Sequence, residues 1–345
     1  MINLFSDTQT KPTAAMREAM MYAEVGDEQS GSDPTVNLLL EKTAGLLGKE
    51  AALFLPTGTM CNLVAVKTHT LPGQAVLLDR MAHIMRMETG GAAIASSVVL
   101  ETLPSEFGQF AAQAVRDALL LPPSNYTPPP ALLCVEQTHN FGGGSVWPLG
   151  ELTAVCDAAR EHDLAVHMDG ARLFNSVVAS GISAAEYSAV CDSVWVDFTK
   201  GLGAPMGAVL AGSSDFIEAA RRYKHAFGGA MRQAGIAAAG CIYALDHHIE
   251  RLQADHDNMQ LLAAGLRQIP GIVVPDRVDT NILFFEMADG AGIDAAGFEA
   301  GMRERGVLLT RLGSRLRAVT HLDVSREEIE RAIGAARLLM AAWQH

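Results

Sequence analysis

Long apolar runs are absent from this sequence, and no uninterrupted stretch is long enough to span a bilayer. The first twelve residues have neither the positive start nor the apolar core of a secretory leader. Charged residues make up only 19% of the 345 residues and hydrophobic residues 49%, which is ample for one large domain and a smaller one. We therefore expect a packed globular protein in the cytoplasm.

Positive charge is scarce as well. The chain has 26 Lys and Arg residues against 39 Asp and Glu residues, a formal net charge of -13, and no basic stripe. Because phosphate backbones select basic surfaces, this balance argues against nucleic acid as the main partner.

Cysteine and metal-binding patterns are also poorly represented. The five cysteines are scattered and lack CxxC spacing, and Cys134 and Cys191 lie in or beside apolar strand patterns, so we expect buried, reduced thiols. The eleven histidines contain no HExxH pattern. His247 and His248 are adjacent on a predicted helix and would point to different faces, so we expect no catalytic metal.

Strands and helices alternate between residues 50 and 212. Apolar, β-branched runs predict strands at 75–79, 98–103, 131–137, 164–169 and 194–198, and amphipathic patterns predict helices at 36–48, 110–120, 150–162, 183–190 and 213–225. This order indicates an α/β fold with a mostly parallel sheet wrapped by helices, whose ligands gather at the carboxyl ends of the strands.

The two ends of the chain have a different character. Residues 1–35 read as an irregular arm with one short helix, and the acids of segment 26–35 are expected to be solvated. After a long helix that ends near residue 266, alternating strands flank a helix at 294–305, and a helix at 325–342 follows. We expect an N-terminal arm (1–25), a large domain (26–245) and a small C-terminal α+β domain (246–345).

Lys200 is the first candidate for chemistry. It directly follows the predicted strand at 194–198 and is followed by the small residues of GLGAPMG, which let another molecule approach the backbone closely. We expect apolar surface around this lysine, which would disfavour its charged form and leave an amine able to form a Schiff base with a carbonyl.

Two further segments fit one cofactor. Asp169 ends the predicted strand at 164–169, where a carboxylate can pair with the pyridinium nitrogen of pyridoxal phosphate. Gly58 and Thr59 stand where an apolar run turns into a helix, and small and hydroxyl residues at a helix N-terminus form an anion site suited to a phosphate. Together the three segments describe a holder for pyridoxal phosphate.

Other polar residues also fall just past predicted strand ends or in loops. His83 and Thr138 follow strands, so one cleft could collect them with Thr59, Asp169 and Lys200. Arg232 near the start of a helix could meet a phosphate or pair on the surface. Among the arginines of the last strand, 311, 315 and 317, one facing the cleft could clamp a substrate carboxylate.

The chain resembles the threonine aldolase family of fold-type-I pyridoxal phosphate enzymes over nearly its whole length. The resemblance rests on nine segments in order: LFSDTQTKPT, GSDPTVN, TGTMCN, HIMRMETGG, EQTHNFGGG, HMDGARLFN, TKGLGAPMG, GGAMRQAG and RAVTHLDVS. It implies a fold-type-I transferase-like α/β fold with a seven-stranded type of sheet. It also implies a homotetramer whose active sites lie between subunits.

The resemblance also implies roles for particular residues. Lys200 would hold the cofactor through the Schiff base, Asp169 would pair with the ring nitrogen, and His83 would stack on the ring and serve as a base. Gly58 and Thr59 would hold the phosphate, with Arg232 as a further phosphate or interface contact. The residues implied to grip the substrate carboxylate are Ser6, Arg172 and Arg317. The activity implied is cleavage of L-β-hydroxy-α-amino acids to glycine and an aldehyde.

Two departures from the family pattern concern the substrate. The segment DEQSGSDPT has Ser30 where the family usually has a tyrosine, and Tyr126 stands where many members carry a substrate-side histidine. They leave open an aldolase for bulkier β-substituents such as phenylserine, or a β-eliminating lyase. A non-catalytic oligomeric relative is a third alternative, which the presence of Lys200 and Asp169 disfavours.

Overall fold

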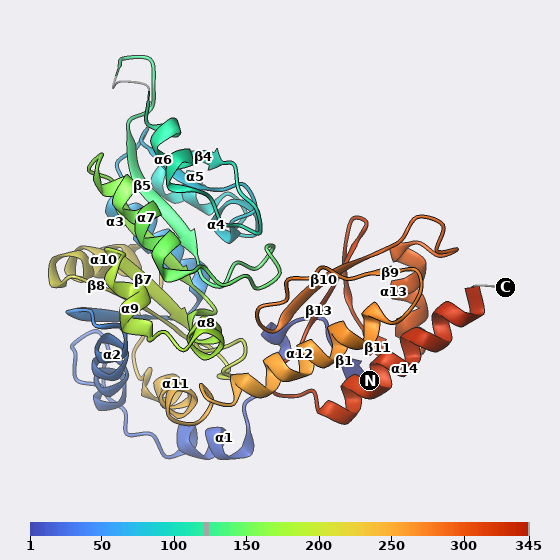
Figure 1. Cartoon of the computed structure of the whole chain (residues 1–345). Coiled ribbons are helices and arrows are strands. Elements are labelled where there is room, and N and C mark those ends of the chain that lie inside the picture. Colours follow the sequence, from blue (N-terminus) through green and yellow to red (C-terminus); the bar gives the residue numbers. More distant parts are fainter. Residues whose placement is uncertain (121–123, 344–345) are drawn as a thin grey trace.

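The computed structural model describes residues 1–120 and 124–343 and consists of two bodies, a large one and a smaller one that carries both termini (Figure 1). The large body contains a seven-stranded sheet. In spatial order its strands are β2 (Ala51–Leu55), β8 (Ala208–Gly212), β7 (Ser193–Asp197), β6 (Ala165–Gly170), β5 (Pro130–Glu136), β3 (Ala75–Asp79) and β4 (Val99–Leu103). Only β8 runs antiparallel to its neighbours, which confirms the mostly parallel α/β sheet expected from the sequence.

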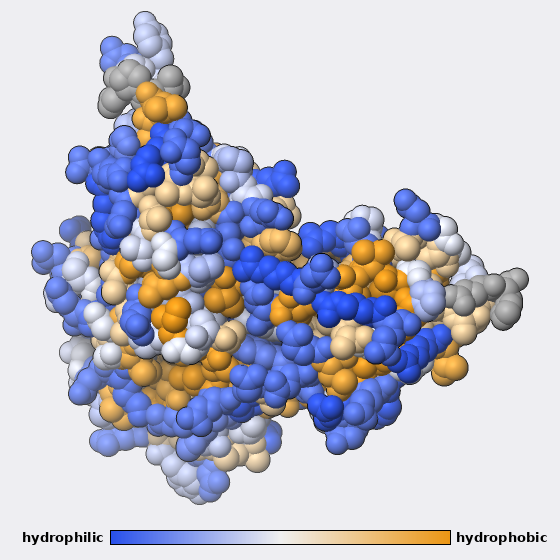
Figure 2. All heavy atoms as spheres, in the orientation of Figure 1, coloured by the Kyte–Doolittle hydropathy of each residue, from blue (hydrophilic) through white to orange (hydrophobic). Residues whose placement is uncertain are grey.

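Helices cover both faces of this sheet. One face packs against α2 (Pro34–Leu47), α6 (Ala112–Ala118), α7 (Leu149–Arg160), α8 (Leu173–Ser180), α9 (Ala184–Ala189) and α11 (Gly235–His247). The other face packs against α3 (Gly58–His69), α4 (His83–Arg86), α5 (Gly91–Ser96) and α10 (Ser214–Ala226). Figure 2 shows that hydrophobic residues also gather in patches on the surface of both bodies.

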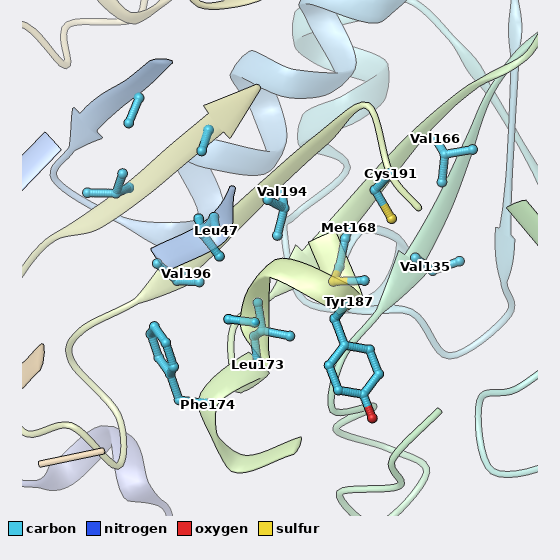
Figure 3. Packing of buried hydrophobic residues seen from close by; sticks show 14 of the residues in the cluster. Leu47, Val135, Val166, Met168, Leu173, Phe174, Tyr187, Cys191, Val194 and Val196 are labelled. Atoms are coloured by element: carbon cyan, nitrogen blue, oxygen red, sulfur yellow. The ribbon is translucent and has the colours of Figure 1, made fainter. Parts of the chain in front are cut away.

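Successive side chains of each strand point to opposite faces of the sheet and so pack into different hydrophobic clusters. Val194 and Val196 pack with Met168 and Leu173 on one face (Figure 3), whereas Trp195 between them packs on the other face against α3 and α10. Since both faces of the central strands are buried, these strands are mostly apolar rather than alternating in polarity. His167 in the middle of β6 is a buried polar exception.

The smaller body has a core of its own. Its four-stranded antiparallel sheet has the order β12 (Thr310–Leu312), β13 (Arg315–Val319), β10 (Ile282–Met287) and β9 (Ile272–Val273). Its helices are α12 (Leu252–Arg267), α13 (Ala295–Glu304) and α14 (Arg326–Trp343), and β1 (Ile2–Asn3) pairs in parallel with β11 (Val307–Leu308). The first residues of the chain thus belong to the small body. The pairing of β1 with β11 covers two residues on each strand, which is too short for the sequence pattern to reveal.

The arm then crosses to the large body. After a 3-10 turn at Asp7–Gln9, α1 (Ala14–Met21) packs against α11, and its N-cap is Thr13, whose hydroxyl accepts the Met16 N–H. The arm therefore links the two bodies by contacts as well as by sequence.

The long helix expected to end near residue 266 is two helices, so that expectation was wrong. α11 ends at His247, and the next residue, His248, caps it and donates from Nδ1 to the Leu202 carbonyl at 2.6 Å. Leu245 of α11 packs into the core of the large body, whereas Met259 of α12 packs into that of the small one. The two helices therefore belong to different bodies.

The expectation that the acids of segment 26–35 are solvated was wrong for two of them. Asp33 is fully buried, caps α2 by accepting the Val36 N–H, and also accepts from the Gly26 and Gly235 amides. Glu28 is buried in an ion pair with Lys224. A short loop between packed elements has several backbone N–H groups to satisfy, and carboxylates do this well.

Among the described residues, no helix combines the length and the apolar content needed to cross a membrane. The domain limits expected at residues 25 and 245 stay predictions.

Candidate active site

A cavity of about 410 Å³ opens at the carboxyl ends of the central strands, between the large body and the arm and last strands of the small one. It is lined by most of the residues singled out in the sequence: Ser6, Gly58, Thr59, His83, Asp169, Arg172, Lys200 and Arg317. Parallel strands end at one edge of a sheet, so residues more than a hundred positions apart meet there.

Lys200 lies in the loop after β7. Its Nζ forms an ion pair with Asp197 Oδ2 at 2.9 Å and lies 5.5 Å from the centre of the Trp195 ring. The expectation that Lys200 has apolar surroundings was therefore wrong, because the strand ends in the carboxylate of Asp197, three residues before the lysine. The arm fixes the loop, since the Thr10 hydroxyl donates to the Lys200 carbonyl at 2.8 Å.

Asp169 is buried at the end of β6. Its Oδ2 accepts from Asn62 Nδ2 at 2.8 Å, and its Oδ1 accepts from the Ala171 N–H at 3.1 Å. Burial, together with the negative charge of Glu136, raises the pKa of Asp169 to about 6, despite the opposing charges of His83 and Lys200. The two hydrogen-bonding groups on Asp169 are both neutral.

His83 begins α4 at the edge of the cavity. Its Nδ1 lies 2.8 Å from Glu88 Oε1, and its backbone N–H donates to Glu136 Oε2 at 2.8 Å. Burial alone would lower the pKa of His83, but the Glu88 hydrogen bond and the carboxylates of Asp169 and Glu136 outweigh it and raise the pKa. With Nδ1–H held by Glu88, Nε2 is the nitrogen that can exchange a proton.

The side chains of His83, Glu88 and Asp169 each offer a ligand atom within 4.8 Å of the others. Glu88 Oε1 bonds to His83 Nδ1, and Asn62 donates to Glu88 at 2.7 Å as well as to Asp169. The Asn62 amide therefore links the two carboxylates of this cluster.

The N-terminus of α3 borders the cavity. Thr57 is the N-cap and accepts the Met60 N–H at 3.2 Å, so the amides of Gly58 and Thr59 are left without intrahelical partners. A Cβ on Gly58 would lie 2.3 Å from the Trp195 ring, so only glycine fits at this point. Helix N-termini of this kind suit an anion.

The two arginines of the cavity differ in their partners. Arg172 is buried and donates twice to the Asp7 carboxylate, at 2.7 and 2.6 Å. Arg317 donates only to neutral oxygens, Asn140 Oδ1 at 3.1 Å and the Phe5 carbonyl at 3.2 Å, and its buried Nε has no partner among the described residues. Burial and the nearby Arg172 charge lower the pKa of Arg317 to about 10, which indicates an under-compensated cation.

Four predicted residues do not line this cavity. Tyr126 is 95% exposed on a loop that projects from the large body (Figure 1), and Ser30 is exposed and bonded within its own loop. The Arg232 side chain is 64% exposed and pairs with Asp27 at 2.9 Å. Thr138 is buried behind the cavity wall.

Several residues at the site were missed by the sequence reasoning. Asn62, Glu88, Glu136 and Asp7 all contact a predicted residue of the cavity and are all buried. All four stand inside segments quoted for the resemblance, LFSDTQTKPT, TGTMCN, HIMRMETGG and EQTHNFGGG, but only the fold shows what they touch.

The residues of the cavity fit pyridoxal phosphate. Asp169 is a buried carboxylate bonded only to neutral donors, a setting that a pyridinium N–H would complete, and the cavity volume lies within the usual range for cofactor sites. An amine, Lys200, and a helix N-terminus border the same space. The cavity thus offers an amine for the carbonyl group of pyridoxal phosphate and a helix N-terminus for its phosphate group.

Comparison with known proteins agrees with this fit. Residues 3–290 match the family described as beta-eliminating lyase. The chain is 42% identical to the low-specificity L-threonine aldolase of Escherichia coli K12, covering 99% of this chain and 100% of that one. It is 39% identical to low-specificity L-threonine aldolase 1 of Arabidopsis thaliana, covering 99% and 97%.

Solved structures share the fold. The threonine aldolase of Leishmania major matches with a TM-score of 0.84 at 21% identity, covering 99% of this chain and 100% of that one. The serine palmitoyltransferase of Sphingomonas wittichii matches with a TM-score of 0.76 at 18% identity, covering 99% and 88%. From the family match and the extent of these identities, the chain belongs to the beta-eliminating lyase family and, within it, to the low-specificity threonine aldolases, pyridoxal phosphate-dependent lyases of fold type I.

Proposed function

We propose that this chain cleaves L-β-hydroxy-α-amino acids, L-threonine among them, to glycine and an aldehyde by breaking the Cα–Cβ bond. The observation that carries the proposal is one cavity bordered by an amine (Lys200), a buried acid (Asp169), an imidazole (His83) and an under-compensated guanidinium (Arg317). These are the groups that such a reaction needs.

Bound pyridoxal phosphate supplies an electron sink for the electron pair released at Cα. Lys200 would hold its aldehyde carbon and give it up to the substrate amine. Asp169, as the carboxylate, would hold a proton on the ring nitrogen, and the amides of Gly58 and Thr59 would bind the phosphate. In these roles the residues of two strand ends and one helix N-terminus converge on a single ligand.

His83 is the candidate base. Its Nε2 would take the proton of the β-hydroxyl group, while Nδ1–H stays on Glu88. The O–H electron pair then forms the aldehyde C=O, the Cα–Cβ pair stays with Cα, and Cα takes up a proton to give glycine. The raised pKa of His83 makes its imidazole a stronger base for this proton.

Arg317 is the candidate partner of the substrate carboxylate. Among the described residues its Nε has no partner and its hydrogen-bond acceptors are neutral oxygens, so an incoming carboxylate would complete its hydrogen bonding. Arg172 was expected to share this role, but its charge is already paired with Asp7. We assign Arg172 to holding the arm, with Ser6 beside it, at the mouth of the site.

The apolar side chains along the cavity bear on the β-substituent. They are Phe5, Met87, Phe141 and Leu312. Because they offer no hydrogen-bond partner, they suit methyl or phenyl groups, which supports a broad choice of substrate.

We further propose that Arg232 and Tyr126 act in the site of a second copy of this chain. Both are exposed, and Arg232 borders a mostly apolar pocket of about 310 Å³ lined by Met206, Met231 and Ile236 among others. Exposed apolar pockets of this kind mark contacts between proteins. The homotetramer, the cytoplasmic location and a substrate role for Ser30 stay predictions.

A product assay tests the reaction. Purified protein is incubated with L-threonine, L-allo-threonine and L-phenylserine; we expect glycine with acetaldehyde or benzaldehyde, and none from a Lys200→Ala variant. Ammonia with a 2-keto acid would instead assign the chain to β-elimination. The absence of both product pairs would refute the proposal.

A further inference from the structure

Asn62, on α3 behind the cavity, is 1% exposed, and both ends of its side chain are bonded. Its Nδ2 donates to Glu88 Oε1 at 2.7 Å and to Asp169 Oδ2 at 2.8 Å. Its Oδ1 accepts from Trp195 Nε1 at 2.7 Å and lies 3.2 Å from His167 Nε2. One amide thus joins two carboxylates of the site to two rings behind it.

The direction of these bonds is determined by chemistry. An indole nitrogen can only donate, so the atom facing Trp195 must be the amide oxygen and the NH₂ group must face the carboxylates. The same oxygen requires His167 to carry its proton on Nε2, so His167 Nδ1 accepts from the Ser193 hydroxyl at 2.8 Å. Burial lowers the pKa of His167 to about 3, which keeps it in this neutral form.

The bonds continue to His69. The Ser193 oxygen, having donated to His167, accepts from His69 Nε2 at 2.7 Å. In the series of hydrogen bonds from His69 to Asn62, each donor therefore points towards the site, and the series ends on Asp169 and Glu88. A flip of the amide would turn its NH₂ group towards the Trp195 N–H and its oxygen towards the two carboxylates, so a single orientation is enforced.

The two acceptors are both important to the proposed function, on which this inference rests. Among the residues that the structure describes, Asn62 supplies one of the two donors to Asp169, the other being the Ala171 amide. Through Glu88 Oε1, which also faces His83 Nδ1, the same amide fixes the orientation of the imidazole. Glu88 Oε2 has no partner among the described residues, so Oε1 alone anchors this carboxylate.

We propose that Asn62 is a positioning residue whose single amide holds Asp169 and Glu88 in place, and thereby sets the orientation of the cofactor ring nitrogen and of His83. The charged or titratable groups that face this pair come from every neighbouring element: Glu136 and Cys134 of β5, His83 of α4, Cys61 of α3, Asp197 of β7 and Lys200 after it. These groups stay unchanged in the test below.

The test measures the dissociation constant of pyridoxal phosphate, from its absorbance, in the cofactor-stripped full-length chain between pH 5 and 9. In Asn62→Ala, a charge-assisted donor to Asp169 is lost, so we expect binding to weaken about tenfold at neutral pH. Losing a donor to the charged form raises the pKa of the acid. The affinity of the variant should therefore begin to fall at a higher pH than that of the parent.

Asn62→Asp guards against misfolding. It keeps the shape of the side chain and the acceptor for Trp195 and His167 but has at most one proton to donate, so we expect the same direction of change. The control is Asn258→Ala, which removes another buried asparagine, bonded to the Val324 carbonyl in the small body. It should lower the Tm and leave the pH dependence unchanged.

Folded Asn62 variants that bind the cofactor within twofold of the parent, with the same pH dependence, would overturn the proposal. So would a pH shift of equal size in Asn258→Ala, or a failure of both Asn62 variants to fold, because either result assigns Asn62 a purely structural role. A parent protein that binds no pyridoxal phosphate would refute the proposed function instead.

Discussion

Three candidate residues of this site pair with carboxylates. Lys200 pairs with Asp197, His83 with Glu88, and Arg172 with Asp7. The exceptions are Asp169, which has only neutral donors, and Arg317, which has only neutral acceptors. In the proposed function, the cofactor ring nitrogen supplies the charged partner of Asp169, and the substrate carboxylate supplies that of Arg317.

The His83–Glu88 pair gives a prediction at this scale. In Glu88→Gln the negative partner of the imidazole is lost, so the pKa of His83 should fall, because the Glu88 hydrogen bond and charge are among the causes that raise it. If His83 is the base that must be neutral, the acidic limb of the kcat/KM profile should move to lower pH. NMR titration of the imidazole measures the pKa directly.

Glu161→Gln is the matched control for that change, since Glu161 forms an exposed pair with Arg116 far from the cavity. It should leave both the titration of His83 and the pH profile unchanged. An unaltered profile in Glu88→Gln, combined with a lowered His83 pKa, would show that His83 is not the base.

At the scale of the element, the N-terminal arm is part of the active site. It starts in the small body at β1, pairs Asp7 with Arg172, bonds Thr10 to the Lys200 carbonyl and offers the Phe5 carbonyl to Arg317. The sequence pattern suggested only an irregular segment with one short helix. Its position could not be predicted because its contacts lie far away along the chain.

The Asp7–Arg172 pair gives the second prediction. Removing one partner of a buried ion pair leaves an uncompensated charge, so Asp7→Asn should lower the free energy of unfolding by about 3 kcal/mol. Burial opposes ionisation, but Arg172 outweighs it and holds the pKa of Asp7 well below its usual range. This contribution is present above about pH 4, the unfolded value, and is lost as the pH falls through the lower folded value.

Urea unfolding at neutral pH and at decreasing pH measures this effect. The control is Asp27→Asn, which breaks the exposed pair with Arg232 and should change the free energy of unfolding by less than about 1 kcal/mol. Equal effects of the two substitutions would contradict the importance assigned to the buried pair.

At the scale of the whole molecule, buried neutral histidines should govern stability in acid. Burial lowers the pKa of His167 to about 3, that of His69 to about 4 and that of His256 to about 4. Below about pH 6.5 these residues take up protons in the unfolded chain but not in the folded one, so stability should fall as the pH drops towards 4. His83 and His139 have raised pKa values and oppose this trend.

The urea midpoint as a function of pH checks the balance. His167→Gln should flatten the curve between about pH 6.5 and pH 4, because about one fewer proton is then taken up on unfolding. A midpoint that is constant over this interval in the parent would contradict the prediction.

The proposed exchange of residues between subunits gives a prediction for the assembly. Lys200→Ala and Arg232→Ala, each expected to be weakly active or inactive alone, should regain part of the activity when mixed under conditions that let subunits exchange. A mixed pair then contains one site with an intact lysine from one copy and an intact arginine from the other. If no activity returns although mixed oligomers form, the two residues serve the same subunit's site.

The sequence by itself determined the α/β alternation, the strand-end positions of Lys200 and Asp169, the helix N-terminus at Gly58 and the family, because periodicity and local motifs are properties of short segments. Only the tertiary structure decided which groups meet. The carboxylate beside Lys200, the pairing of Arg172 with Asp7, the exposure of Arg232 and Tyr126, and the amide of Asn62 between two acids all depend on contacts between distant segments. Hydrogen bonds and ion pairs act over a few ångströms of space, so their partners follow from the packing of the sheet and not from spacing along the chain.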